Sequence, residues 1–223
     1  HRAQVGHAGT LDPGASGVLP VAIGKATKLL PYLPKSKAYT AGVKFGVTTT
    51  SEDADGEVTS TCDASWLTQA SVEEQLPGFT GTFQQRPPLV SAVHVRGRRA
   101  YDRARVDEDF TEDDLPVREA YVSSLELVSW TAGAHPRARL AVECGEGVYI
   151  RSIARDLGRR LRAQAASNPV GASLCSLERT HSNGFGLGVC VDVPSSVAAL
   201  QGALLPPQAA LQHLPLAVPA CPA

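Results

Sequence analysis

The sequence predicts an α+β fold in which helices flank a mixed, mostly antiparallel sheet. Short apolar segments, some of them alternating with polar residues, are typical of strands and are separated by turn-forming residues. Other segments repeat apolar residues at helical spacing. The expected order is strand, helix, strand, loop, strand, strand and helix, and with its hairpin turns this order favours a mostly antiparallel sheet.

The N-terminal part alternates expected loops with short elements. Residues 1–17 are rich in glycine and small polar residues and are expected to form a loop. Residues 18–23 form a short apolar run, which predicts a buried strand. Residues 25–33 place apolar side chains at helical spacing until Pro34 ends the helix, and residues 39–45 alternate as a strand does.

The following elements are spaced more widely. Ser71 has the spacing of a capping box with Glu74, so a short helix is expected to begin there and to close near Pro77. The remaining predicted elements are, in order, strands at 117–128 and 139–144, a hairpin-type turn at 145–147 and an amphipathic helix from Ile150 to Leu161.

The composition is that of a folded protein with a hydrophobic core. The chain has 223 residues, of which 43% are hydrophobic, so disorder is not expected. Polar or charged residues interrupt every apolar stretch, and we expect no membrane association. Five scattered cysteines without metal-ligand spacing indicate reduced thiols in an intracellular compartment and no metal site. A chain that starts at His1 and contains no Met is expected to lack its natural N-terminus and any targeting peptide.

The net charge of −1 conceals two basic segments. Residues 86–105 contain six arginines and one acid, and residues 137–162 contain seven arginines and three acids. Such segments are suited to contact phosphate groups, and ordinary solvated arginines are the alternative explanation.

Asp12 lies in an unusual loop between Val5 and Pro20. Four glycines in this window let the backbone bend tightly or approach a ligand, and Pro13 fixes the exit of the chain. Such a loop is able to hold a carboxylate rigidly at a cleft. Taken alone, an Asp-Pro pair among glycines is more often a turn.

The whole window resembles the central motif of the bacterial-type tRNA pseudouridine synthases, the TruB family. The family pattern is G-H-x-G-T-L-D-P-x-A-x-G-V-L-P, and it aligns with Gly6–Pro20. Further segments resemble the family's other landmarks in the same order: Lys37-Ala38-Tyr39, Phe45–Gly56, Gln85–Ala92, Gly97–Arg105, Gly147–Ser152 and Leu211–Pro215. The resemblance therefore extends over nearly the whole chain.

The resemblance implies a pseudouridine synthase-like fold with a central RNA-binding cleft. It implies that Asp12 is the catalytic aspartate, that Tyr39 lies against the target base and that Arg151 pairs with Asp12. It also implies that His7 fills the space left by an extruded base. The residues expected to contact RNA or the base are His7, Gly9, Thr10, Leu11, Tyr149 and Leu177.

The implied reaction isomerises a uridine in the T arm of tRNA, at position 55, to pseudouridine. The bond from ribose C1′ to N1 breaks and the base rejoins through C5, which needs no metal or other cofactor. A carboxylate serves either as a nucleophile or as a stabiliser of a cationic sugar that then assists proton transfer, and the sequence leaves both routes open. The expected partner is tRNA, bound through its T arm by a monomer.

Each site residue has a simpler explanation when taken alone. A lone Tyr39 on a strand is usually a core or cross-strand residue, Arg151 at a helix start is usually a surface charge, and His7 in a loop is usually exposed. Asp53 and Asp55 raise the question of a metal, but residues 50–56 lack the spacing of a calcium loop, and we expect turn residues near RNA.

Several positions depart from the family pattern. Glu146 and Val148 replace a lysine and a threonine, Glu178 replaces an arginine of an L-R-R motif, and residues 164–169 are expected to be an insertion. An upstream K-P-x-G-x-T-S segment is missing. The two glutamates are expected to weaken phosphate contacts, because RNA affinity depends on how many phosphate charges are neutralised.

These features give the following expectations for the chain. Residues 1–216 form a catalytic domain whose start is missing, residues 217–223 form a C-terminal tail, and no C-terminal RNA-binding domain follows. The expected location is intracellular, either the cytoplasm or an organelle. Two alternatives stay open: a pseudouridine synthase that depends on a guide RNA, and a non-catalytic protein that binds or folds tRNA.

Overall fold

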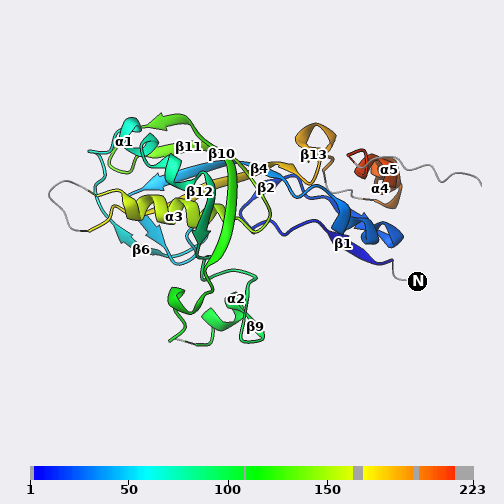
Figure 1. Ribbon diagram of the computed structural model, residues 1–223, viewed down its shortest axis with the longest axis horizontal. Helices are drawn as coiled ribbons and strands as arrows, with labels where there is room; N and C mark the ends of the chain where they lie inside the picture. Colours follow the sequence, from blue (N-terminus) through cyan, green and yellow to red (C-terminus); the bar gives the residue numbers. More distant parts are fainter. Residues whose placement is uncertain (1–2, 108, 163–167, 193–195, 214–223) are drawn as a thin grey trace, which may run out of the picture.

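The computed structural model describes residues 3–107, 109–162, 168–192 and 196–213, and its centre is a seven-stranded sheet (Figure 1). The hydrogen-bonded path runs through β13 (Phe185–Gly186), β12 (Ala172–Ser182), β4 (Lys37–Phe45), β11 (Arg137–Cys144), β10 (Arg118–Thr131) and β7 (Gly81–Gln85). All pairings along this path are antiparallel, whereas β2 (Ser16–Gly17) runs parallel to β12. The prediction of an α+β fold with a mixed, mostly antiparallel sheet is confirmed.

Strand β4 is the middle of this sheet. Its side chains alternate between the core and the opposite face, and Tyr39, Ala41, Val43 and Phe45 are buried. Tyr39 pairs in register with Val142 of β11 on one side and Arg179 of β12 on the other. This regular alternation is why the strand could be predicted from the sequence.

Helix α3 (Ile150–Arg160) lies across the core face of the sheet and packs against β12 and β4 (Figure 1). Its apolar residues recur at three- and four-residue spacing, so Ile153, Ala154 and Leu157 face the core. Gly158 lies against the backbone of residues 171–172, which permits this close packing. Helix α1 (Gln69–Glu73) and the 3₁₀ turn η2 (Leu76–Phe79) pack near β10.

The helix α1 begins earlier than predicted. Its N-cap is Thr68, whose side chain accepts a hydrogen bond from the Ser71 backbone, while the Ser71 hydroxyl group accepts one from the Thr68 backbone. Ser71 is therefore the third residue of the helix and not its cap. The turn at 145–147 was also predicted wrongly as a hairpin type, since it connects β11 to α3.

The N-terminal part differs most from expectation. Residues 1–17 are not all loop, because β1 (Val5–His7) pairs antiparallel with β3 (Val21–Ile23). The strand expected at 18–23 is shorter, since only residues 21–23 form it, and it is not buried: Val21 is 53% exposed, whereas the buried Val18 lies before the strand. The helix expected at 25–33 is a 3₁₀ helix, η1 (Gly24–Tyr32), which contains Pro31.

Residues 88–107 and 109–115, here called the arginine-rich lobe, project from the sheet as a separate lobe (Figure 1). The lobe contains β8 (His94–Val95), β9 (Arg98–Arg99), α2 (Ala100–Ala104) and the 3₁₀ turn η3 (Glu112–Asp114). Its small core consists of Val93, Val95, Ala100, Phe110 and Leu115. Both ends of the lobe connect to the sheet. Arg86 and Pro87 link β7 to the start of the lobe, and β10 follows its end.

The other elements are short. They are β5 (Val47–Thr49) with its partner β6 (Val58–Thr61), the 3₁₀ turn η4 (Leu187–Val189), α4 (Val197–Ala203) and α5 (Pro207–Ala210). Within the described ranges, no helix is both long and apolar enough to cross a bilayer. The expected tail at 217–223 and most of the expected insertion at 164–169 lie outside the described residues.

Candidate active site

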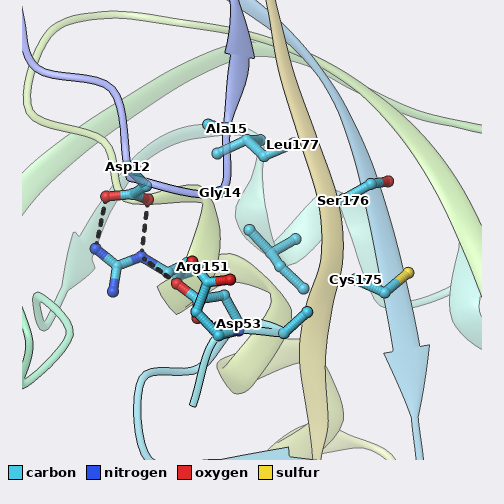
Figure 2. Close-up of a pocket in the computed structure, with 11 residues that line it drawn as sticks. Asp12, Gly14, Ala15, Asp53, Arg151, Cys175, Ser176 and Leu177 are labelled. Carbon is cyan, nitrogen blue, oxygen red and sulfur yellow. Dashed lines mark hydrogen bonds and ion pairs between the residues drawn. The ribbon is translucent and has the colours of Figure 1, made fainter.

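The centre of the site is an ion pair between Asp12 and Arg151 (Figure 2). Arg151 Nε donates to Asp12 Oδ2 at 2.9 Å, and Nη2 donates to Oδ1 at 2.8 Å. Such a two-pronged contact is stronger and more directional than a single neutral hydrogen bond. The Arg151 side chain is 6% exposed and that of Asp12 is 33% exposed. The Asp12 carboxylate is therefore held by a buried guanidinium and is itself partly accessible to solvent.

The guanidinium of Arg151 is also fixed by two other segments. Its Nη1 donates to the carbonyl oxygens of Ser51 and Val90, at 3.0 and 3.1 Å. Its Nε lies 3.7 Å from Asp53 Oδ2. A buried cation is costly unless it is paired and hydrogen-bonded, and these contacts meet that requirement.

Residues 50–56 form a turn, as expected, and this turn carries Asp53 towards Arg151. The Asp53 Oδ1 accepts hydrogen bonds from the Ser51 hydroxyl and the Asp55 backbone. Asp53 therefore belongs to the site as the second carboxylate beside the arginine, a role that the sequence reasoning did not assign. Within the described residues, no group of three or more His, Cys, Asp or Glu side chains is arranged to hold a metal ion.

Arg179 of β12 holds the loop that carries Asp12. It is fully buried, and it donates from Nε to the carbonyl of Val18 at 2.7 Å and from its Nη atoms to the carbonyls of Thr10 and Gly9 at 3.2 and 3.1 Å. The loop is thus tied down on both sides of Asp12. The sequence reasoning missed this residue, although it noted the segment Leu177-Glu178-Arg179 for its replaced arginine.

The loop also approaches β12 at Gly17. The φ angle of Gly17 is +106°, and an added Cβ would collide with the backbone of Arg179.

Replacing Gly17 by Ala is expected to cost roughly 3–5 kcal/mol of unfolding free energy, from backbone strain together with overpacking. Gly24→Ala is the matched control, because Gly24 also has a positive φ (+65°) but open space around it, and about 1–2 kcal/mol is expected. Urea denaturation measures both, and equal losses would contradict the role of the close approach.

Tyr39 of β4 pairs in register with Arg179, the residue that holds this loop. Burial raises the pKa of its hydroxyl, the hydrogen bond with Arg179 opposes that rise, and the nearby charge of Asp12 adds to it. The hydroxyl is therefore protonated at neutral pH. The structure thus brings Tyr39, Arg179 and Asp12 into one electrostatic group.

Tyr149 caps the start of α3, next to Arg151. Its backbone N–H donates to Gln85 Oε1 at 2.8 Å, and its carbonyl accepts from Gln85 Nε2 at 3.0 Å. Burial is the main cause of the raised pKa of its hydroxyl, to which the charge of Asp12 contributes. Gln85 is buried and fixes the approach of the helix to the site.

A small pocket of about 50 Å³ opens beside the ion pair (Figure 2). Its lining consists of Asp12, Gly14, Ala15, Asp53, Ala54, Asp55, Arg151, Leu174, Cys175, Ser176 and Leu177. Of the residues predicted to be catalytic or to contact RNA, Asp12, Arg151 and Leu177 line it. His7, Gly9, Thr10, Leu11, Tyr39 and Tyr149 are not among the described residues that do.

His7 and the two replaced positions, Glu146 and Glu178, are not among the described residues that line the pocket. The Nδ1 of exposed His7 accepts a 3.3 Å hydrogen bond from the backbone of Gly9. Glu146 lies 3.6 Å from Lys35 in an exposed ion pair, and Glu178 is half-buried on β12. Neither glutamate lies in the pocket.

Comparison with known proteins places this geometry in context. Residues 1–150 match the family described as TruB family pseudouridylate synthase (N terminal domain). The chain is 45% identical to tRNA pseudouridine synthase B of Trichormus variabilis over 215 residues and 45% identical to that of Synechocystis sp. over 216 residues. Each alignment covers 95% of this chain and 70% of the relative.

Two solved structures share the fold. A Cbf5-Nop10-Gar1 complex matches with a TM-score of 0.64 at 26% identity, and an H/ACA RNP bound to a substrate RNA matches with a TM-score of 0.62 at 23% identity. Both alignments cover 95% of this chain, which spans about half the length of the chains it matches (54% and 53%).

Proposed function

The chain belongs to the TruB family of pseudouridylate synthases, and from this premise we propose that it converts a uridine in the T arm of tRNA to pseudouridine, with Asp12 as the catalytic carboxylate. The observation that carries the proposal is the two-pronged contact between Asp12 and buried Arg151 at the edge of an open pocket. The names of these two relatives support tRNA as the substrate.

The reaction balances without a change of oxidation state. The C1′–N1 bond breaks, a C1′–C5 bond forms, the proton on C5 leaves to solvent and N1 gains a proton. Asp12 either attacks C1′ or stabilises the cationic sugar and then accepts a proton, and both routes need a carboxylate held in one orientation. Arg151 supplies that orientation.

The base must leave its stack to reach Asp12. Extrusion of a base costs a few kcal/mol, and a residue that fills the vacated space recovers part of that cost. His7 is suited to this because it is an exposed aromatic side chain five residues before Asp12. The pocket of about 50 Å³ is smaller than the roughly 300–1,000 Å³ typical of ligand sites.

Tyr39 offers both an aromatic face for the uracil and a hydroxyl for proton transfer. We expect Tyr39→Phe, which keeps the ring, to lower kcat by roughly 10²-fold, the lower end of the usual effect of a general acid or base. Tyr39→Leu, which loses the ring as well, is expected to lower it further. Single-turnover rates with tRNA measure both, and a Tyr39→Phe rate within twofold of wild type would exclude a proton-transfer role.

The substrate is tested with transcripts of one tRNA. We expect a single pseudouridine at the T-arm uridine, without added guide RNA, and no product when that uridine is replaced by cytidine. Product at other uridines would contradict the T-arm proposal. Product only with a guide RNA would favour the guide-dependent alternative.

A non-catalytic tRNA-binding or folding protein is the remaining alternative. It gives no reason for a buried arginine to hold an aspartate at the edge of a pocket, with the Tyr39 hydroxyl close enough for the charge of Asp12 to raise its pKa. We further propose that residues 1–216 act as the catalytic domain, that the protein works as a monomer, and that it is located inside the cell with its tRNA.

A further inference from the structure

Helix α3 carries a second buried arginine, Arg155, one helical turn after Arg151. Its side chain is about as buried as that of Arg151. Its Nη1 donates to Glu52 Oε1 at 2.8 Å and lies 3.3 Å from Glu112 Oε1, and its Nε donates to Asp156 Oδ1 at 2.8 Å. Three carboxylates thus surround one guanidinium inside the protein.

The same guanidinium also binds backbone. Its Nη2 donates to the carbonyl of Arg86 at 2.9 Å, and its Nη1 to that of Pro87 at 3.5 Å. These two residues directly precede the arginine-rich lobe, whereas Glu112 lies near the end of the lobe. Arg155 therefore holds both ends of the lobe against α3.

Arg151 depends on the same segments. Its carbonyl partners are Ser51, next to Glu52, and Val90, three residues after Pro87. Its second carboxylate partner, Asp53, directly follows Glu52. A shift of Glu52 or of residues 86–87 would therefore move the atoms that orient Arg151.

Glu52 has an uncommon backbone conformation and a buried carboxylate oxygen without a hydrogen-bond partner among the described residues. Its φ is +64°, an uncommon conformation for a residue with a side chain, and its buried Oε2 has no hydrogen-bond partner among the described residues. Burial raises the pKa of Glu52, and Arg155 opposes that rise. Local strain of this kind persists only where surrounding contacts enforce it, and it is concentrated at functional sites.

We propose that Arg155 is a positioning residue that keeps Arg151, and through it Asp12, aligned by holding the Glu52 turn and both ends of the arginine-rich lobe together. This rests on the proposed function of Asp12 and Arg151. Arg155 itself does not line the pocket and is not expected to touch the substrate.

The test compares Arg155→Met with Arg159→Met in the otherwise complete chain. Arg159 shares Glu112 and Asp156 but is 49% exposed, and its ion pairs within the described part of the chain reach neither Glu52 nor residues 86–87. We expect Arg155→Met to lower kcat by about 10²-fold, the effect of a displacement of about 1 Å, with the KM for tRNA within about twofold. Arg159→Met is expected to change both by less than about threefold.

Two further variants keep the test decisive if Arg155→Met folds poorly. Arg155→Lys keeps the charge but loses the planar fork, so partial activity is expected. Glu52→Gln keeps the shape and removes the charge, and a loss in kcat of about tenfold is expected. Because Arg155 acts through Arg151, adding Arg155→Met to Arg151→Lys should lower kcat no further than Arg151→Lys alone.

An NMR readout separates this proposal from the proposed function. The Nε–H of Arg151 is expected to exchange slowly with water in the wild-type chain and in Arg159→Met, and faster in Arg155→Met. Slow exchange in folded Arg155→Met, or a wild-type kcat in that variant, would overturn the positioning role. Absence of pseudouridine with wild-type protein would instead refute the proposed function, and the exchange result would still decide the positioning role.

Discussion

Replacing Asp12 by Asn is expected to lower the rate of pseudouridine formation by about 10⁴-fold or more, the size of effect seen when a principal catalytic group is removed. Asn keeps the shape and one acceptor for Arg151, but it neither attacks C1′ nor stabilises a cationic sugar. Because C5 loses its proton in the reaction, release of tritium from C5-labelled uridine in tRNA measures the rate. Binding of tRNA is expected to stay within a few-fold of wild type.

The matched control for this variant is Asp55→Asn. Asp55 lines the same pocket, but its carboxylate has no contact with Arg151 among the described interactions. We expect its rate to stay within about threefold of wild type, since the general field of one exposed charge is weak and screened. If Asp12→Asn kept a tenth of the wild-type rate, Asp12 would not be the catalytic carboxylate.

Replacing Arg151 by Met is expected to reduce both activity and stability. It leaves the carboxylates of Asp12 and Asp53 without their cation and the carbonyls of Ser51 and Val90 without a donor. Loss of one partner of a buried ion pair typically costs about 3–5 kcal/mol. With the Asp12 carboxylate no longer oriented, kcat is expected to fall roughly 10²–10⁴-fold.

Arg151→Lys separates these two effects. Lys keeps the charge but contacts the carboxylate as a single point and does not reproduce the planar fork. The unfolding free energy, measured with urea, is expected to fall less than in Arg151→Met, while kcat still falls by about 10²-fold. A wild-type rate in Arg151→Lys would mean that charge alone, and not the two-pronged geometry, is what Asp12 needs.

The fold was predictable where the pattern is local and regular. β4 alternates over nine residues, and α3 keeps its apolar spacing over eleven. β12 was missed because its pairing with β4 shifts register after Leu174 and after Arg179, which breaks the alternation that identifies a strand. The short strand β1 was missed, and the strand containing β3 was predicted too long and too buried, because three partly exposed residues are too few to show a period.

The site was predictable only in part, for a physical reason. Asp12, Tyr39 and Arg151 were found because each lies in a segment that resembles a family motif. Arg179 and Arg155 were not found, because a buried arginine and a surface arginine look alike in sequence. What distinguishes them is their partners, which lie up to 170 residues away in the chain.

The most direct test of the proposed chemistry is chemical mapping of pseudouridine in an unmodified tRNA transcript after incubation with the wild-type chain or with Asp12→Asn. The expected result is one new pseudouridine, at the T-arm uridine, with the wild-type protein and none with the variant under the same conditions. The same pseudouridine with both proteins, or none with the wild type, would contradict the assignment of Asp12 as the catalytic carboxylate of a tRNA pseudouridine synthase.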